Sequence, residues 1–204
     1  MVVSFLVVSF AALPASAGLV TWEFEGVVTS FLDGNNLLGG SVSVGTPFSG
    51  SFTFDTTTPD SQPSNAVLGV YENAVVSLDG ILAGNVFSSL DSLNMVIRND
   101  SPLTVGVLDS LRLSGQAALA GEALYVTLEI SDADGAIFSS DSMPLVPPSL
   151  EALERADFML SAQDLFIGVR GDLTALVPEP GTLGMLVFGA IMIFKRRTRR
   201  YTRV

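Results

Sequence analysis

Short segments in which apolar and polar residues alternate recur along most of this chain, and this pattern limits what it can fold into. In residues 20–26 the side chains of Val20, Trp22 and Phe24 fall on one side, and the residues between them are polar. Successive side chains of a β-strand point to opposite faces, so the alternation indicates a half-buried strand. Patterns of this kind predict strands over residues 20–26, 48–55, 67–78, 93–98, 103–113, 124–131 and 165–176.

Residues that favour turns separate these predicted strands. Clusters of Asp, Asn, Gly and Pro occur at residues 33–36, 79–80, 99–102 and 132–135, and such clusters end a strand and reverse the chain. Many short strands joined in this way predict a mostly β, antiparallel fold of the β-sandwich or jelly-roll type. Residues 55–65 are polar and contain prolines, which predicts a long surface loop.

One short helix is expected among the strands, over Leu150–Ala156. It follows Pro147 and Pro148, with Ser149 as its N-cap and Glu151 in its first turn, where a negative charge is favourable. The sequence contains no internal repeat, and its 204 residues are enough for one core-bearing domain plus targeting segments.

The chain contains neither Cys nor His, which excludes several kinds of site. Without Cys there is no disulfide, thiolate metal ligand or cysteine nucleophile. Without His there is no imidazole metal ligand and no Ser-His-Asp triad. We therefore expect no catalytic residues, no metal site and no cofactor.

The N-terminal residues have the features of a signal peptide. Residues 1–10 are almost entirely apolar, Pro14 follows, and Ala15 and Ala17 frame a small-x-small cleavage site. Cleavage after Ala17 would leave Gly18 as the new N-terminus. A signal peptide normally begins with Lys or Arg, so we expect the true start to lie upstream. The alternative is a buried strand or core helix.

The C-terminal residues combine an apolar run with a cationic end. Residues 181–194 carry no charge, and six of the ten basic residues fall in the last ten positions. At about 1.5 Å per residue the run spans roughly 21 Å, so it crosses a bilayer of about 30 Å only if flanking residues extend it. Basic residues stay in the cytoplasm, which would place the bulk of the chain outside the membrane. A buried amphipathic helix is disfavoured, because no polar face exists.

The segment Val177-Pro178-Glu179-Pro180, the apolar run and the basic end together resemble the PEP-CTERM sorting signal of Gram-negative bacteria. The resemblance covers residues 177–204 only. It implies a processing motif at Pro178, Glu179 and Pro180, recognised by an exosortase, and transfer to the cell surface or to extracellular polysaccharide. The resemblance implies where the protein is sent but no activity, because this tail follows many unrelated domains. The membrane-flanking cationic cluster consists of Lys195, Arg196, Arg197, Arg199 and Arg200.

The chain is thus expected to have a signal peptide (1–17), a passenger domain (18–176) and a sorting signal with a transmembrane helix (177–204). All 21 acidic residues except Glu179 lie in the passenger, against four arginines. Such a surface repels phosphate backbones and argues against a nucleic-acid partner. The expected partners are signal peptidase, exosortase, the inner membrane transiently, and extracellular polysaccharide.

Some passenger residues allow a more specific reading. Glu23 and Glu25 share a strand face about 7 Å apart, near the spacing of glycosidase carboxylates, although two solvated residues explain them better. Trp22 and Tyr71 suggest a sugar-stacking platform, against which the core pattern favours simple packing.

Acidic residues raise the question of calcium. Asp132-Ala133-Asp134-Gly135 is similar to part of a calcium loop, but position 143 is Met where an EF-hand needs Glu, and a hairpin turn explains the segment better. Asp55, Asp60 and Asp141 are a weak second candidate for calcium. The threonines at 53 and 56–58 are not periodic, which favours a loop over an ice-binding face.

The sequence as a whole predicts an exported protein with a structural or adhesive, non-catalytic role. A carbohydrate- or calcium-dependent binding module is the first alternative. A carboxylate-dependent glycan hydrolase is the second, since such chemistry needs no His.

Overall fold

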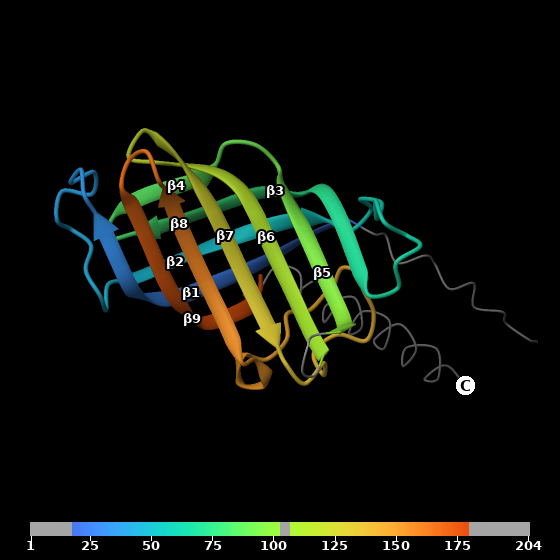
Figure 1. Ribbon diagram of the computed structural model, residues 1–204. Coiled ribbons are helices and arrows are strands. Elements are labelled where there is room, and N and C mark those ends of the chain that lie inside the picture. Colours follow the sequence, from blue (N-terminus) through green and yellow to red (C-terminus); the bar gives the residue numbers. More distant parts are fainter. Residues whose placement is uncertain (1–17, 103–106, 180–204) are drawn as a thin grey trace, which may run out of the picture.

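The computed structural model describes residues 18–102 and 107–179, and these residues form an antiparallel β-structure (Figure 1). Helical structure in these ranges is limited to the short 3₁₀ segment η1 (Leu150–Ala152). The strands are β1 (Leu19–Asp33), β2 (Pro47–Asp55), β3 (Leu68–Leu82), β4 (Asn85–Ser89), β5 (Leu93–Pro102), β6 (Val107–Leu119), β7 (Glu122–Asp132), β8 (Arg155–Ala162) and β9 (Ile167–Pro178).

The strands close into a barrel. Starting from β2 the order is β2, β1, β9, β8, β7 and β6, after which β5 and β3 lead back to β2 through the β5–β6, β3–β5 and β2–β3 pairings. The short strand β4 fills the gap between β3 and β6 at one end, where β5 does not reach. In Figure 1, β6, β7 and β8 cross in front of β1, β2 and β3.

The β-sandwich or jelly-roll prediction was therefore wrong in its finer part, while the mostly β, antiparallel fold is confirmed. Strands of a sandwich and strands of a barrel both alternate one buried and one solvated face, so alternation does not separate them. The pairing of β2 with β3 is what closes this sheet.

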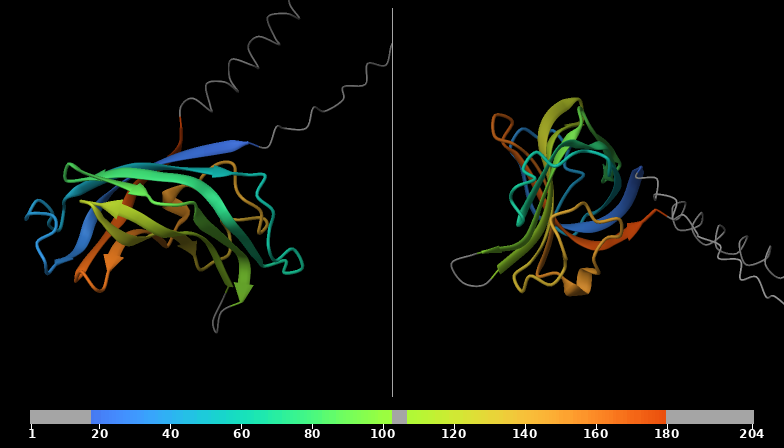
Figure 2. Two further views of the ribbon diagram at one scale, coloured as in Figure 1. Left: turned by 90° about the horizontal axis from the view of Figure 1, so that it is seen from above. Right: turned by 90° about the vertical axis from the view of Figure 1, so that its right-hand side faces the viewer.

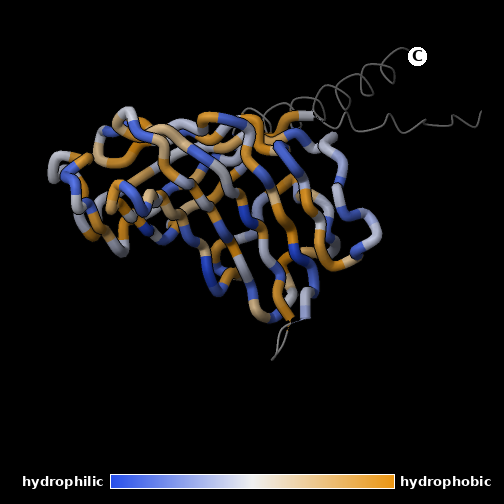
Figure 3. The backbone as a smooth tube through the Cα atoms, turned by 45° about the horizontal axis from the view of Figure 1, so that its top comes forward, coloured by the Kyte–Doolittle hydropathy of each residue, from blue (hydrophilic) through white to orange (hydrophobic). Residues whose placement is uncertain are grey.

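Aromatic side chains fill the interior of the barrel. Apolar and polar residues alternate along the strands (Figure 3), and the apolar set points inward. The closest of the inner rings, Phe48 and Phe158, have centroids 5.0 Å apart. The rings in this interior cluster are Trp22, Phe24, Phe48, Phe52, Phe54, Phe87 and Phe158, each no more than 3% exposed.

Glycines on the inner face make room for four of these rings. A Cβ atom at Gly80 would lie 2.2 Å from Phe87, and one at Gly171 would lie 2.2 Å from Phe48, so each ring occupies the space that a side chain would take. This pairing of aromatic rings with glycines lets the strands bend around a small core. The directly opposite pairs are Phe24 with Gly50, Phe48 with Gly26, Phe87 with Gly80 and Phe158 with Gly171.

Two local predictions failed because strand pairing overrode local signals. The expected helix Leu150–Ala156 is reduced to η1, Ser149 makes no side-chain cap, and β8 already begins at Arg155. The turn expected at residues 79–80 lies inside β3, and the chain reverses instead at Ala83 and Gly84, both with positive φ, as tight hairpins require. The strands β4 and β8 were not predicted.

The other turn predictions had mixed outcomes. The turn at 33–36 and the loop after Asp55 are confirmed. Residues 99–102 belong to β5, where the pairing register shifts between Arg98 and Ser101. Residues 132–135 form a turn, although it opens a long connection to β8 rather than a hairpin.

The first and last described residues lie at the same end of the barrel. β1 begins beside the end of β9, with Trp22 opposite Pro178, and the two strand ends are neighbours in both views of Figure 2. The predicted signal peptide and transmembrane helix fall outside the described residues. Within residues 18–102 and 107–179, no helix has the length and hydropathy needed to span a bilayer.

Candidate functional site

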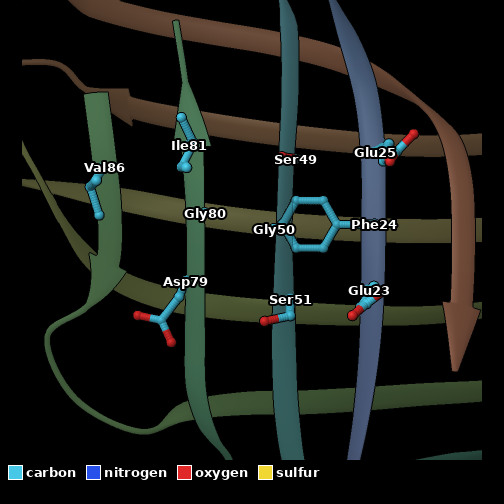
Figure 4. Close-up of a pocket in the computed structure, with 10 residues that line it drawn as sticks. All are labelled: Glu23, Phe24, Glu25, Ser49, Gly50, Ser51, Asp79, Gly80, Ile81 and Val86. Atoms are coloured by element: carbon cyan, nitrogen blue, oxygen red, sulfur yellow. The ribbon is translucent and has the colours of Figure 1, made fainter. Parts of the chain in front are cut away.

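Two hollows lie on the outer surface of the barrel, on different groups of strands. The larger, about 500 Å³, covers parts of β1, β2, β3 and β4 (Figure 4). We call it the acidic depression. Its outward-facing side chains are Glu23, Glu25, Ser49, Ser51, Asp79, Ile81 and Val86.

Strand register sets the arrangement of the acidic depression. Glu23, Ser51 and Asp79 form one row across three strands, and the row of Glu25 runs parallel to it. Gly50 and Gly80 lie between these rows, and the Phe24 ring extends across Gly50 in Figure 4. The depression lies over bare backbone, because Phe24, Gly50 and Gly80, which lie between the two rows, face the interior of the barrel.

The prediction that Glu23 and Glu25 share a strand face is confirmed, since both line the acidic depression. The sequence analysis missed Asp79 as their neighbour because it placed this residue in a turn. Glu25 and Asp79 are exposed and Glu23 is partly exposed. These carboxylates lie on β1 and β3, on either side of β2, where they can meet polar or cationic groups of a ligand.

The second hollow is a cleft of about 120 Å³ on the outer face of β6, β7, β8 and β9. We call its residues the arginine cluster, because three of the four arginines in the described part of the chain lie here. Such a gathering of cations is unexpected on a passenger with so many acids. The members of the cluster are Arg112, Thr127, Glu129, Arg155, Asp157, Met159 and Arg170.

Asp157 lies at the centre of the arginine cluster. Its Oδ2 atom accepts hydrogen bonds from Arg155 Nε and, at 2.8 Å, from Arg170 Nη2. The side chain of Asp157 is 9% exposed, whereas both arginines are about half exposed. The hydrogen bond to Asp157 raises the pKa of Arg155 above its ordinary value. Asp157 thus holds two guanidinium groups at the rim of the cleft.

Two further groups of the cluster have no partner. Thr127 is 6% exposed, and its Oγ1 atom makes no hydrogen bond within the described part of the chain. The buried Nε atom of Arg112 is also unpaired there. Glu129 lies directly opposite Arg112 across the β6–β7 pair, yet no ion pair joins them among the described residues. Buried polar atoms usually have partners, so these two need an explanation.

Sequence reasoning did not find the arginine cluster. Its charged residues lie on four strands, and the prediction had placed Arg155 in a helix and had no strand over Asp157. Arg112, Glu129 and Asp157 become one row only once the β6–β7 and β7–β8 registers are known. The available signal was weaker: single charges at outward positions of apolar strands.

Two of the acidic residues considered for calcium, Asp55 and Asp60, accept hydrogen bonds from nearby groups of the chain. Asp55 Oδ1 accepts hydrogen bonds from Thr57, which lower the pKa of Asp55. Asp60 Oδ1 accepts from the backbone of Gln62 and Val70, both at 2.8 Å. Within residues 18–102 and 107–179, no group of three acidic residues is arranged to hold a metal ion.

Asp132 also binds its own turn. It accepts from the backbone N–H groups of Asp134 and Ala136. Its cross-strand neighbour Asp109 is fully buried, and its two carboxylate oxygens accept three backbone N–H groups, from Asp100, Ile137 and Phe138. These carboxylates fasten the connection after β7.

The packing role preferred for Trp22 and Tyr71 is confirmed. Trp22 is fully buried, and Tyr71 is 6% exposed, with its hydroxyl donating to the Asp141 backbone oxygen. Burial, and then the nearby Asp60 and Asp141 charges, raise the pKa of Tyr71. Neither ring is available for stacking on a sugar.

The predicted processing motif starts inside the sheet. Pro178 is the last residue of β9, and the Glu179 N–H donates to the Thr21 backbone oxygen at 3.1 Å. At the other end, the Gly18 N–H donates to Thr56 Oγ1 at 3.1 Å. Pro180, Ala15, Ala17 and the basic residues Lys195, Arg196, Arg197, Arg199 and Arg200 lie outside the described residues.

No protein-family model, no curated protein and no solved structure matches this chain. Its function therefore rests on the geometry of its own residues.

Proposed function

We propose that this protein is exported, sorted to the cell surface or extracellular matrix, and acts there as a structural or adhesive barrel without catalysis. One observation supports this most strongly: the barrel is complete between Gly18 and Glu179. These two positions are the ones at which the sequence predicts cleavage by signal peptidase and recognition by an exosortase.

The ends of the barrel agree with such processing. β1 and β9 pair along almost their whole length, and both predicted targeting segments follow from the same end of that pair. Removal of both segments would leave every strand pairing intact. A folded unit would then remain after the membrane helix is lost.

The filled interior favours a role for the outer surface. The aromatic rings occupy the centre of the barrel, and both hollows open on its outer face. A closed barrel with a packed core has no internal room for a ligand. Ligands would therefore meet the side chains that point outward, which suits adhesion.

The test is to express the full chain in a host with and without its exosortase, and to measure the intact mass and the cell fraction. We expect a product that starts at Gly18, ends near Pro178 and leaves the inner membrane only when the exosortase is present. The variant Glu179→Ala should stay uncut, and Glu151→Ala, an exposed glutamate on η1, should be processed normally. An uncut chain in the inner membrane of the complete host would overturn the proposal.

A glycan hydrolase remains the second candidate, because Glu23, Glu25 and Asp79 meet in one open depression. Hydrolysis needs two carboxylates on either side of a bound sugar. If this candidate is right, the purified chain releases reducing ends from the host polysaccharide, and Glu23→Gln or Asp79→Asn abolishes the release. We expect the original chain and both variants to release no reducing ends.

A further inference from the structure

The arginine cluster holds polar groups that the rest of the fold does not use. Arg155 and Arg170 pair with Asp157, but Arg112 Nε and Thr127 Oγ1 stay unpaired within the described residues. A buried group without a partner costs roughly 1–3 kcal/mol. Where such groups line an open cleft, a bound ligand can supply the missing hydrogen bonds.

We infer that the arginine cluster binds the carboxylate of a hydroxylated acid, such as a uronic acid residue of a polysaccharide. This inference deepens the proposed adhesive function and rests on it. Guanidinium groups match a carboxylate in shape and charge, and their bonds to it are charge-assisted. Arg112 is the arginine of the cluster without an acidic partner, so its guanidinium is free to take the ligand carboxylate.

The acidic members of the cluster limit which anion fits. Glu129 and Asp157 lie in the same cleft and would repel a dianion such as phosphate. They are also acceptors for hydroxyl groups, and Thr127 can donate or accept. A singly charged acid that carries hydroxyls satisfies both kinds of group. Met159 adds an apolar contact for a sugar ring.

The size of the cleft agrees with one sugar carboxylate and its neighbouring atoms. A water molecule takes up roughly 30 Å³ in the liquid, so about 120 Å³ has room for a few non-hydrogen atoms. The remaining surface is strongly acidic and would repel a uniformly charged polymer. We therefore expect recognition of single uronic acid residues rather than of a uniformly charged polymer.

A purely structural role makes a different prediction about Arg112. A cross-strand ion-pair ladder would join Arg112 to Glu129, its direct neighbour across the strands. The described residues instead leave Arg112 unpaired while Asp157 takes both other arginines. The cluster is thus organised around Asp157, with one guanidinium left over.

The experiment uses the full chain purified in detergent and measures binding of glucuronic acid, and of glucose as the neutral control, by calorimetry. We expect glucuronic acid to bind at least tenfold more tightly than glucose. Arg112→Gln should weaken this binding about tenfold, and Thr127→Val, which keeps the side-chain shape, should weaken it severalfold. Arg98→Gln is the matched control, because Arg98 contacts Ser110 outside the cleft. Thermal melts confirm that each variant is folded.

The inference is overturned if glucuronic acid and glucose bind equally well or not at all. It is also overturned if Arg98→Gln weakens glucuronic acid binding as much as Arg112→Gln does. Retention of the host polysaccharide by the same proteins separates this failure from failure of the proposed function. If the Arg112→Gln variant retains the polysaccharide as well as the original chain does, the adhesive function is supported and the uronate site is rejected. If glucuronic acid binds but the host polysaccharide is not retained, the uronate site is supported and the adhesive function is rejected. Association of copies that disappears in Arg112→Gln would identify an acidic side chain of a second copy as the true ligand.

Discussion

On the β1–β4 side of the barrel, Asp79 stands exposed in the acidic depression, whereas on the β6–β9 side Asp157 is nearly buried between two arginines. Both residues point outward from strands of the same sheet. The acidic depression is open, with the short side chains of Ser49 and Ser51 between its carboxylates, and water reaches those carboxylates. The arginine cluster is crowded by long side chains that cover one another. The neighbours of an outward charge on adjacent strands, rather than its own strand, therefore determine how much that charge contributes to stability.

Stability should change most when the inner face of β3, behind the acidic depression, is filled. In Gly80→Ala the new Cβ would meet the Phe87 ring at 2.2 Å and the Ser49 backbone oxygen at 2.6 Å. Neither a buried ring nor backbone can move away cheaply, so we expect a loss of about 3 kcal/mol in the free energy of unfolding. Urea denaturation measures it. Gly168→Ala is the control, because nothing lies within 4 Å of its Cβ and its stability should hardly change. Equal stability of the two variants would show that the Phe87 ring does not depend on the space at Gly80.

The next largest change in stability comes from neutralising Asp157, which can be compared directly with neutralising Asp79. Asp157→Asn removes the charge between Arg155 and Arg170 and should cost about 1.5 kcal/mol of unfolding free energy, since both arginines are half exposed and screened by water. Asp79→Asn should stay within about 0.5 kcal/mol of the original chain. Equal costs in urea denaturation would contradict the contrast between the two faces.

The smallest change in stability is expected at Tyr71, an ionisable side chain that packs against the loop containing Asp141. The raised pKa of Tyr71 means that the folded state holds the phenol proton more tightly than the unfolded chain does. The stabilisation is complete below pH 10, the ordinary pKa region, and is lost as the pH rises through the folded value. Urea midpoints between pH 9 and 11.5 should fall more steeply for the original chain than for Tyr71→Phe. Parallel slopes would mean that burial at this position has no influence on ionisation.

The sequence predicted the inner side of this barrel better than its outer side. Val20, Trp22 and Phe24 were assigned to one buried face from alternation alone, because each strand shows its own buried side in the local sequence. Closure also needs β1 to pair with β9, which comes from the other end of the described chain, and no single segment encodes that pairing. β8 was hidden by helix-like signals at Pro147, Pro148 and Ser149.

The candidate sites follow the same division. Glu23 and Glu25 belong to one strand, so their shared face was predictable, whereas Asp79 joins them only through the β1–β2 and β2–β3 registers. Arg112, Arg155 and Arg170 come from three strands and meet only in the folded sheet. A one-residue change of register would turn each of these side chains to the opposite face.

Closure of the sheet also decides how molecules of this kind can meet. Within the described residues every strand, the short β4 included, has a neighbour on both sides. The sheet formed by residues 18–102 and 107–179 therefore has no free edge of backbone N–H and C=O groups, and it offers no template for strand addition or for the fibres that grow from it. However densely such barrels are packed, they would recognise one another and their surroundings through side chains alone.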